Sequence, residues 1–216
     1  MALLIAFSGI DGSGKTTLAR RLVDWLRETG RAAELVRTIS GDSDFFRALA
    51  VLIERHPRID KNAAALLFVF ERAKNALATV APLLERGVTV VCDRYFLCEQ
   101  AYAAGHRVRF GGGIGRELMA LAPPADLTFV VDVPVAVAME RIARRGRTWT
   151  FQENAATLTR ARRAFLRLAR GRASGDHGGN AGGDVVVIDG TAPLQAAWEA
   201  VRQAAERRLA LGGGRT

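Results

Sequence analysis

Short apolar runs alternate along the chain with longer segments in which apolar residues recur every three or four positions. The run at 3–7 carries no charged residue, which is typical of a buried parallel strand. Within 14–29, leucines recur at every fourth position and charged residues lie between them, as on one face of a helix. The same patterns predict strands at 3–7, 32–38, 88–92, 127–133 and 184–189. They predict helices at 14–29, 42–55, 63–85, 96–104, 115–121, 134–145, 152–170 and 192–210. Pro82 is expected to bend or end the helix at 63–85.

Strands that alternate with helices predict an α/β fold, in which right-handed crossovers join the strands of a parallel sheet. A length of 216 residues fits a single domain, which we place at 1–210. The segment 171–183 is polar and rich in glycine, so it predicts a flexible surface loop. Residues 211–216 have the composition of a disordered tail.

A glycine-rich loop follows the first predicted strand and precedes the first predicted helix. Its sequence matches the full G-x-x-x-x-G-K-[ST] pattern of a phosphate-binding P-loop. Glycines let backbone N–H groups point into one concavity, and the helix N-terminus favours an anion there. The lysine of such a loop reaches the β- and γ-phosphates, and the hydroxyl after it ligates Mg²⁺. We therefore expect a nucleoside triphosphate to contact Gly9, Gly12, Ser13, Gly14, Lys15, Thr16 and Thr17.

The polar residues after the strand at 88–92 indicate what happens to the bound phosphate. The strand leads into Asp93, Arg94 and Tyr95. A carboxylate there can hold a metal ion or its waters, and an arginine can neutralise charge that develops between two phosphates. Motor-type ATPases usually end this strand in two acidic residues, and the N/TKxD element of switch GTPases does not occur. The pattern favours a small-molecule kinase with Lys15, Asp93 and Arg94 as catalytic residues, although Asp93 could instead cap the next helix.

The composition narrows the class of protein further. Hydrophobic residues make up 49% of the chain and charged residues 25%, which is typical of a globular protein. The net charge of +9 comes mostly from arginine, which indicates either a biased composition or a surface for polyphosphates. Because aromatic and basic residues do not interleave as in RNA-binding sheets, we do not expect nucleic acid as a partner. With no membrane-length apolar run, no secretory leader and only two cysteines, we expect a cytoplasmic protein without membrane contact.

Several segments together resemble the thymidylate kinase family of nucleoside monophosphate kinases. The motifs that carry the resemblance are "FSGIDGSGKTT", "LLFVFERAKN", "DRYFLCEQAY", "PPADLTFVVDVPVAVAMERIARRG" and "VVVIDGTAPLQAAWEAV". They cover most of the chain. The resemblance implies a P-loop NTPase fold with the strand order 2-3-1-4-5 and a short lid at about 141–154. It also implies ATP-dependent, Mg²⁺-assisted phosphorylation of dTMP to dTDP by an enzyme whose relatives are commonly homodimers.

The resemblance assigns roles at the acceptor end of the site. The position of Asp11 lies near the 3′-hydroxyl of the acceptor sugar, and Tyr102 crowds its 2′ position. Phe68 and Arg72 match residues that stack on the acceptor base and hydrogen-bond its edge. They are four positions apart and therefore share one helix face, although Phe68 alone could equally be a core residue. Arg94 matches a residue that contacts phosphate.

Arg37 separates two classes of acceptor. It follows the second predicted strand and matches the residue that binds the acceptor's phosphate. Deoxynucleoside kinases of the same fold carry a carboxylate there, because their acceptor is a neutral hydroxyl that needs a general base. An arginine suits an acceptor that is already an anion. A phosphate oxygen needs positioning and charge neutralisation rather than a strong base.

Arginines also gather in the predicted lid, in the sequence "RIARRGR" at 141–147. In the family, a catalytic arginine comes either from the phosphate loop or from the lid. Because Gly12 leaves the loop without an arginine, the resemblance implies that Arg144, Arg145 or Arg147 closes over the transferred phosphoryl group. The alternative is a solvated basic helix end.

The chain departs from the family pattern around the acceptor base and the lid. Cys98 replaces a serine, and Glu99 replaces a residue that is commonly small, polar and directed at the base, while "RTISGD" replaces the usual Arg-Glu-Pro. Gln152 or Glu153 stands where the lid has its acidic residue. Since a carboxylate only accepts hydrogen bonds, Glu99 could take a ring N–H of thymine or guanine, the amino group of cytosine, or pair with Arg72. A same-fold kinase for another nucleotide or nucleoside, and a non-catalytic nucleotide-binding paralogue, are the alternatives.

Overall fold

The computed structural model describes residues 2–38, 44–56, 58–108, 113–144, 154–173 and 183–212. Within them, five parallel strands form one sheet in the order β2-β3-β1-β4-β5. The strands are β1 Leu4–Ser8, β2 Ala33–Val36, β3 Thr89–Asp93, β4 Leu127–Asp132 and β5 Asp184–Asp189. The α/β fold class and the predicted strand order are confirmed.

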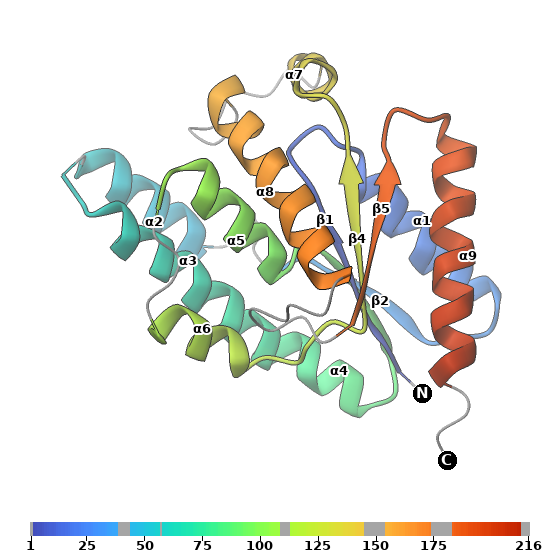
Figure 1. Cartoon of the computed structure of the whole chain (residues 1–216). Coiled ribbons are helices and arrows are strands. Elements are labelled where there is room, and N and C mark those ends of the chain that lie inside the picture. Colours follow the sequence, from blue (N-terminus) through green and yellow to red (C-terminus); the bar gives the residue numbers. More distant parts are fainter. Residues whose placement is uncertain are drawn as a thin grey trace.

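Helices lie on both faces of this sheet (Figure 1). They are α1 Lys15–Glu28, α2 Asp44–Arg55, α3 Lys61–Asn75, η1 Ala76–Val80, α4 Ala81–Glu85, α5 Phe96–Gly105, α6 Gly113–Ala120, α7 Val135–Ala143, α8 Ala155–Ala173 and α9 Leu194–Gly212. Helices α1 and α9 share one apolar cluster with the sheet, and α3, α5, α6 and α8 contribute to the clusters on its other face. Both faces are therefore buried, which explains the uncharged strand at 3–7. Among the described residues, no helix combines the length and apolar character that a bilayer crossing needs.

The register of the two central strands positions the site. Phe7 of β1 lies opposite Asp93 of β3, so the P-loop and the segment after β3 leave the sheet side by side. The carboxyl ends of all five strands meet at this edge. Ligands of open α/β sheets bind at such an edge, outside the ends of the strands.

The helix predicted at 63–85 is divided in the structure. It begins at Lys61, because the side chain of Asp60 accepts hydrogen bonds from the backbone N–H groups of Asn62 and Ala63. A π-helical turn, η1, then separates α3 from α4, and Pro82 lies in the first turn of α4. The irregularity thus precedes the proline. A proline lacks an N–H and fits the first turn of a helix, so the chain continues helically to Glu85.

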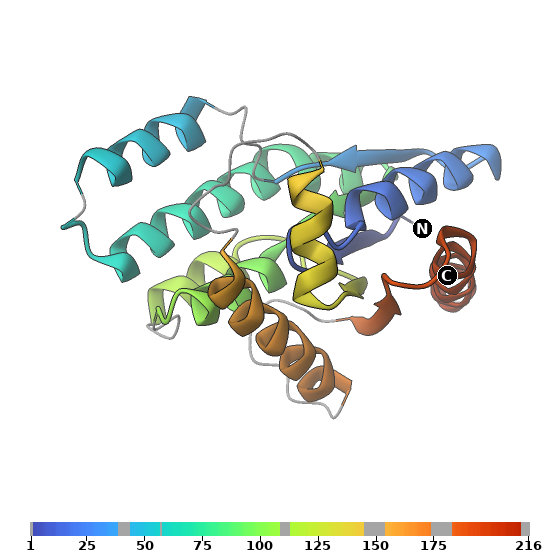
Figure 2. The same ribbon diagram turned by 90° about the horizontal axis from the view of Figure 1, so that it is seen from above.

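Two predicted boundaries differ at the chain's far end. Helix α8 continues to Ala173, three residues into the predicted glycine-rich loop, and α9 continues to Gly212, two residues into the predicted tail. Residues 174–182 and 213–216 lie outside the described residues, as do lid residues 145–153. Seen from above, α2 and α3 lie side by side on the opposite side of the molecule from α9 (Figure 2).

Candidate active site

The P-loop connects β1 to α1 and presents the start of that helix to the ligand edge of the sheet. Gly14 precedes the helix in the left-handed conformation, with φ of 96°. Gly12 also has a positive φ, 81°, and a Cβ built on it would lie 2.4 Å from the carbonyl oxygen of Ala138 in α7. This position therefore accepts only glycine, because the loop backbone packs directly on α7. Ser13 has a buried hydroxyl that makes no hydrogen bond to any described residue, which leaves it available to a ligand.

Lys15 lies at the first position of α1, with a side chain that is almost fully buried. Its Nζ donates a hydrogen bond to the carbonyl oxygen of Ile10 at 3.1 Å and lies 3.9 Å from Asp11 Oδ1. Burial and the charge of Arg94 lower the pKa of Lys15, against the opposing charges of Asp11 and Asp93. The ammonium group is therefore poorly compensated and suited to an additional anion such as a phosphate.

Asp93 joins three parts of the site. Its Oδ2 accepts a hydrogen bond from the Thr16 hydroxyl at 2.7 Å and another from Arg37 Nε at 3.3 Å. Its Oδ1 is buried and has no hydrogen-bond partner among the described residues. Helix α5 begins with Tyr95 as its N-cap residue and has no side-chain cap, so the helix-capping alternative for Asp93 is wrong. An unpartnered carboxylate oxygen beside a threonine hydroxyl fits Mg²⁺, which binds one or two carboxylates together with water and phosphate oxygens.

Arg94 follows Asp93 in a left-handed conformation, with φ of 78°, an uncommon backbone for a long side chain. Its Nη2 donates to Asp11 Oδ1, and the Tyr102 hydroxyl donates to Asp11 Oδ2 at 2.7 Å. Burial raises the pKa of Asp11, but Arg94, Lys15 and the bond from Tyr102 outweigh it and hold that pKa well below its ordinary range. Burial and the adjacent charge of Asp11 raise the pKa of Tyr102. Asp11 is therefore an anion that orders Arg94 and Tyr102 together.

Arg72 and Glu99 form a buried ion pair between α3 and α5. Arg72 Nε and Nη2 donate to the same oxygen, Glu99 Oε1, at 3.0 and 2.5 Å. Arg72 Nη1 donates to the hydroxyl of Thr38, which in turn donates to the carbonyl oxygen of Arg94 at 3.0 Å. Of the partners that the sequence left open for Glu99, the structure shows Arg72. The pair is linked through Thr38 to the backbone next to Asp93.

The remaining acceptor residues lie at different depths. Phe68 is half-buried on α3, one turn before Arg72, so it is not an ordinary core side chain. Cys98 is buried with its Sγ 3.6 Å from the hydroxyl of Ser8 at the end of β1. Its thiol therefore packs against the sheet rather than lying at the surface.

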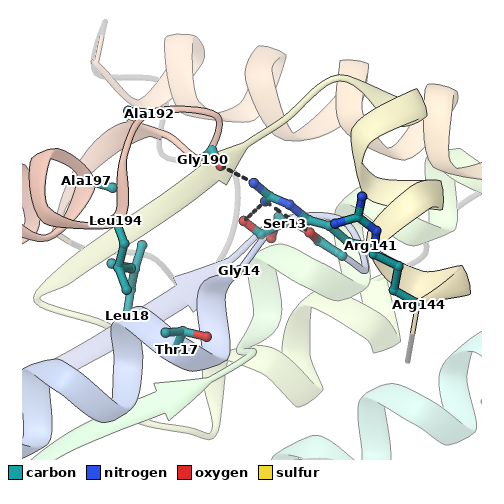
Figure 3. A pocket seen from close by; sticks show the side chains of 11 residues that line it. Ser13, Gly14, Thr17, Leu18, Arg141, Arg144, Gly190, Ala192, Leu194 and Ala197 are labelled. Atoms are coloured by element: carbon teal, nitrogen blue, oxygen red, sulfur yellow. Dashed lines mark hydrogen bonds between the residues drawn. The ribbon is translucent and has the colours of Figure 1, made fainter. Parts of the chain in front are cut away.

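A cavity of about 420 Å³ opens beside the P-loop (Figure 3). Its lining comes from the loop, α1, the end of α7, the β5–α9 connection and the start of α9. It consists of Gly12, Ser13, Gly14, Thr17, Leu18, Arg141, Arg144, Gly190, Ala192, Leu194 and Ala197. Arg141 crosses the wall of this cavity. Its guanidinium donates to the carbonyl oxygens of Gly12 and Ser13 at 3.4 Å each and of Gly190 at 3.0 Å.

The sequence reasoning placed Arg141 in the lid and gave it no role in the site. Arg141 lies three residues after Ala138 and therefore on the same helix face, but only the fold shows that this face meets the P-loop. Of the predicted lid arginines, Arg144 lines the cavity with a side chain that is 76% exposed and paired with Glu140 at 2.6 Å. Arg145 and Arg147 lie outside the described residues, as do Gln152 and Glu153.

Comparison with known proteins agrees with this geometry. The family model for thymidylate kinase matches residues 7–175. A probable thymidylate kinase of Archaeoglobus fulgidus is 32% identical over 210 residues, which cover 97% of each chain. A thymidylate kinase of Dinoroseobacter shibae is 35% identical, over 88% of the present chain and 89% of its own. A thymidylate kinase of Clavibacter michiganensis is 31% identical, over 97% of each chain. From its P-loop to its α8 helix, the chain belongs to the thymidylate kinase family.

Proposed function

We propose that the chain transfers the γ-phosphoryl group of ATP to dTMP and releases ADP and dTDP. The observation that carries the proposal is the arrangement around Asp93. The P-loop supplies a phosphate cradle on one side, and Arg37 and Arg94 supply cations on the other. Two anionic phosphates can therefore meet across one carboxylate, as transfer between two nucleotides requires.

The donor nucleotide would occupy the P-loop and the cavity beside it. Backbone N–H groups of the loop, the Ser13 hydroxyl and Lys15 would contact the phosphates, the usual arrangement in P-loop proteins. The adenine would enter the cavity, where the planar guanidinium of Arg141 is already held by three carbonyl oxygens and can stack on a base. No base-specific side chain is needed for this binding mode.

Thr16 and Asp93 would hold Mg²⁺, because the free Oδ1 of Asp93 and the Thr16 hydroxyl are the oxygen ligands this ion prefers. Bound there, Mg²⁺ supplies positive charge to the phosphates. Arg37 already contacts Asp93 and would orient the acceptor's phosphate, while Arg94 would neutralise charge that develops during transfer. A phosphate oxygen attacks without a strong base, so positioning and charge neutralisation carry the reaction.

The acceptor's sugar and base would lie beyond these phosphates. Asp11, fixed by Arg94 and Tyr102, would accept a hydrogen bond from the 3′-hydroxyl of the sugar. Phe68 would stack on the base and Arg72 would donate to its edge. This assignment favours a monophosphate over a nucleoside, because Asp11 and Asp93 are both engaged by arginines, and an acceptor that is already an anion needs no general base.

The lid arginines are part of the proposal. We infer that Arg144, Arg145 or Arg147 closes over the transferred group, since the packing of Gly12 on α7 leaves no room for an arginine at that position of the loop. Replacing the catalytic one with alanine lowers kcat much more than it raises KM. If each of the three single variants turns over at the native rate, none of these three arginines is catalytic.

An ADP-release assay over a panel of nucleosides and nucleoside monophosphates tests the function. Activity confined to dTMP among natural acceptors supports it, and activity on another nucleotide or on nucleosides indicates the same-fold alternative. ATP binding without turnover indicates the non-catalytic alternative. The variant Lys15→Ala is the control, because any release that survives it does not come from this P-loop.

We also propose that two copies associate through α2, α3 and η1. These elements expose large apolar side chains that are each 42–47% accessible, namely Val51, Leu52, Phe70 and Leu77. The ring of Phe70 lies 6.4 Å from that of Phe45, so the apolar surface continues across both helices. Several exposed large apolar side chains on neighbouring helices are typical of a protein–protein contact, and a self-complementary dimer would cover them on both copies.

Molar mass from light scattering tests this association. The native chain should give twice the mass of one chain, and Phe70→Glu should shift it toward that of one chain. Leu211→Glu is the matched control, because Leu211 is also exposed but lies on α9, on the other face of the sheet. A native mass of one chain, or an unchanged mass in Phe70→Glu, contradicts the proposal.

A further inference from the structure

Thr38 stands where the chain departs from the family pattern, and the proposed reaction gives it no role. It is the second residue of "RTISGD", which replaces the usual Arg-Glu-Pro after β2. Its side chain is 0% exposed, although it lies two residues beyond the end of the strand. A buried hydroxyl is costly unless it is hydrogen-bonded, so the partners of Thr38 indicate what it does.

The hydroxyl of Thr38 both accepts and donates a hydrogen bond. It accepts one from Arg72 Nη1 and donates one to the carbonyl oxygen of Arg94 at 3.0 Å. The carbonyl oxygen of Thr38 accepts a further bond from Asn75 Nδ2 at 2.9 Å, which fixes the backbone of Thr38 to α3. The hydroxyl therefore has a fixed position from which it donates to Arg94.

This bond continues the pairing of β2 with β3 beyond the end of β2. Extended by two positions, the register of the two strands places Arg37 beside Asp93 and Thr38 beside Arg94. Both of these pairs are joined by side chains, because Arg37 Nε donates to Asp93 Oδ2 at 3.3 Å and Thr38 donates to the Arg94 carbonyl. Side-chain hydrogen bonds thus replace the backbone ladder where the chain turns away after β3.

Arg94 needs this support because of its backbone. Its φ of 78° lies in the left-handed region, which is unfavourable for a long side chain and persists only where neighbouring groups hold it. The N–H of Arg94 donates to the carbonyl oxygen of Phe7 in β1 at 2.9 Å, and its carbonyl oxygen accepts from Thr38. Both peptide groups that flank the Arg94 Cα are therefore fixed, and the side chain is directed at Asp11.

We propose that Thr38 is the positioning residue for Arg94. Its hydroxyl holds the left-handed backbone, so that the guanidinium meets the charge that develops between the two phosphates. The inference rests on the proposed function and deepens it, because it names the group that aims this charge. Since a small misplacement of such a charge slows the transfer step, loss of the hydroxyl acts on kcat, while the P-loop keeps its contacts with ATP.

The test compares the native chain with Thr38→Val, which keeps the shape of the side chain without its hydroxyl, and Thr38→Ser, which keeps the hydroxyl. The acceptor is the monophosphate that the native chain uses best, which is dTMP under the proposed function. Turnover is expressed per nucleotide-binding site, counted by equilibrium binding of ADP, so that unfolded protein does not affect it. We expect kcat to fall by about tenfold or more in Thr38→Val and to stay within about twofold of the native value in Thr38→Ser. KM for ATP should stay near its native value in both.

Thr89→Val is the matched control. Thr89 is also buried and its hydroxyl accepts a hydrogen bond from the N–H of Leu3 at 3.4 Å, but it begins β3 at the edge of the sheet opposite the site. Its kcat per site should be native. Thr38→Ala also lacks the hydroxyl and should show the same loss as Thr38→Val, which provides a second measurement if valine prevents folding.

A native kcat per site in Thr38→Val or Thr38→Ala overturns the inference while leaving a nucleotide kinase in place. An equal loss in Thr38→Ser or in Thr89→Val also overturns it, because the effect would then not come from the hydroxyl of Thr38. A native chain that phosphorylates no monophosphate overturns the proposed function and the inference with it.

Discussion

The hydroxyl of Thr16 donates a hydrogen bond to Asp93 Oδ2 at 2.7 Å, which ties the start of α1 to the end of β3. The second oxygen of Asp93 is buried without a partner among the described residues. One carboxylate therefore holds the P-loop helix in place and still offers an oxygen to a metal ion. Arg37, 3.3 Å away, prevents that carboxylate from being an isolated buried charge.

Asp93→Asn should lower kcat by about 100-fold or more, because a neutral amide is a poor ligand for Mg²⁺ and leaves charge uncompensated during transfer. The measurement is turnover as a function of Mg²⁺ concentration, where the half-saturating concentration should rise. The amide oxygen can still accept from Thr16, so the unfolding temperature should change little. A native Mg²⁺ dependence in this variant would remove Asp93 from the metal site.

Gly12→Ala should destabilise the chain more than Gly30→Ala. Both glycines have a positive φ, 81° and 78°, so alanine is strained at either position. A Cβ at Gly30 meets no atom within 4 Å, whereas at Gly12 it meets the Ala138 carbonyl oxygen at 2.4 Å. We expect Gly30→Ala to lower Tm by about 2–4 °C and Gly12→Ala by at least twice as much. Thermal unfolding of both variants measures the difference. An equal decrease of Tm in both would show that α7 does not pack tightly against the loop.

Much of the fold and the donor site is predictable because the signals are local. The strands are buried on both faces, so β1, and β3 as far as Cys92, appear in the sequence as uncharged runs. The P-loop is a continuous motif, and its position between a strand and a helix fixes Lys15 and Thr16 without long-range information. Asp93 follows from the same logic, because a polar residue after a buried parallel strand lies at the ligand edge.

Features that depend on tertiary contact were not predictable from local pattern. The sequence marked Gly12 as a residue of the phosphate loop and as a position without an arginine, whereas the structure shows that α7 excludes any side chain there. Helix α8 runs through Gly171 although glycine costs about 1 kcal/mol in a helix, because α8 packs along α5 and β5. Arg141 became a site residue only once the β5–α9 connection was seen beside the P-loop (Figure 3).

Arg141→Ala should raise KM for ATP by about tenfold and leave KM for dTMP near its native value. The guanidinium forms the wall of the donor cavity and bonds three carbonyl oxygens there, so its loss removes a stacking surface and loosens the P-loop. Arg163→Ala is the control, because Arg163 is an exposed arginine of α8. Initial rates at varied ATP and fixed dTMP measure the effect. A change in KM for dTMP alone would place the cavity at the acceptor instead.

The native chain should lose stability in acid more steeply than the variant Asp11→Asn. Its pKa in the folded chain is depressed below the ordinary value of 3.8, because Arg94 and Lys15 outweigh the effect of burial. The stabilisation that ionised Asp11 contributes is therefore fully present at a pH above the ordinary pKa. It is lost as the pH falls from the ordinary pKa toward the lower pKa of the folded chain. The difference in urea midpoint between native and Asp11→Asn should be constant from pH 7 to about 5 and should narrow toward pH 3. Asp24→Asn, at an exposed position of α1, controls for the change in net charge. A difference that stays constant down to pH 3 would show that the Asp11–Arg94 pair gains nothing from ionisation.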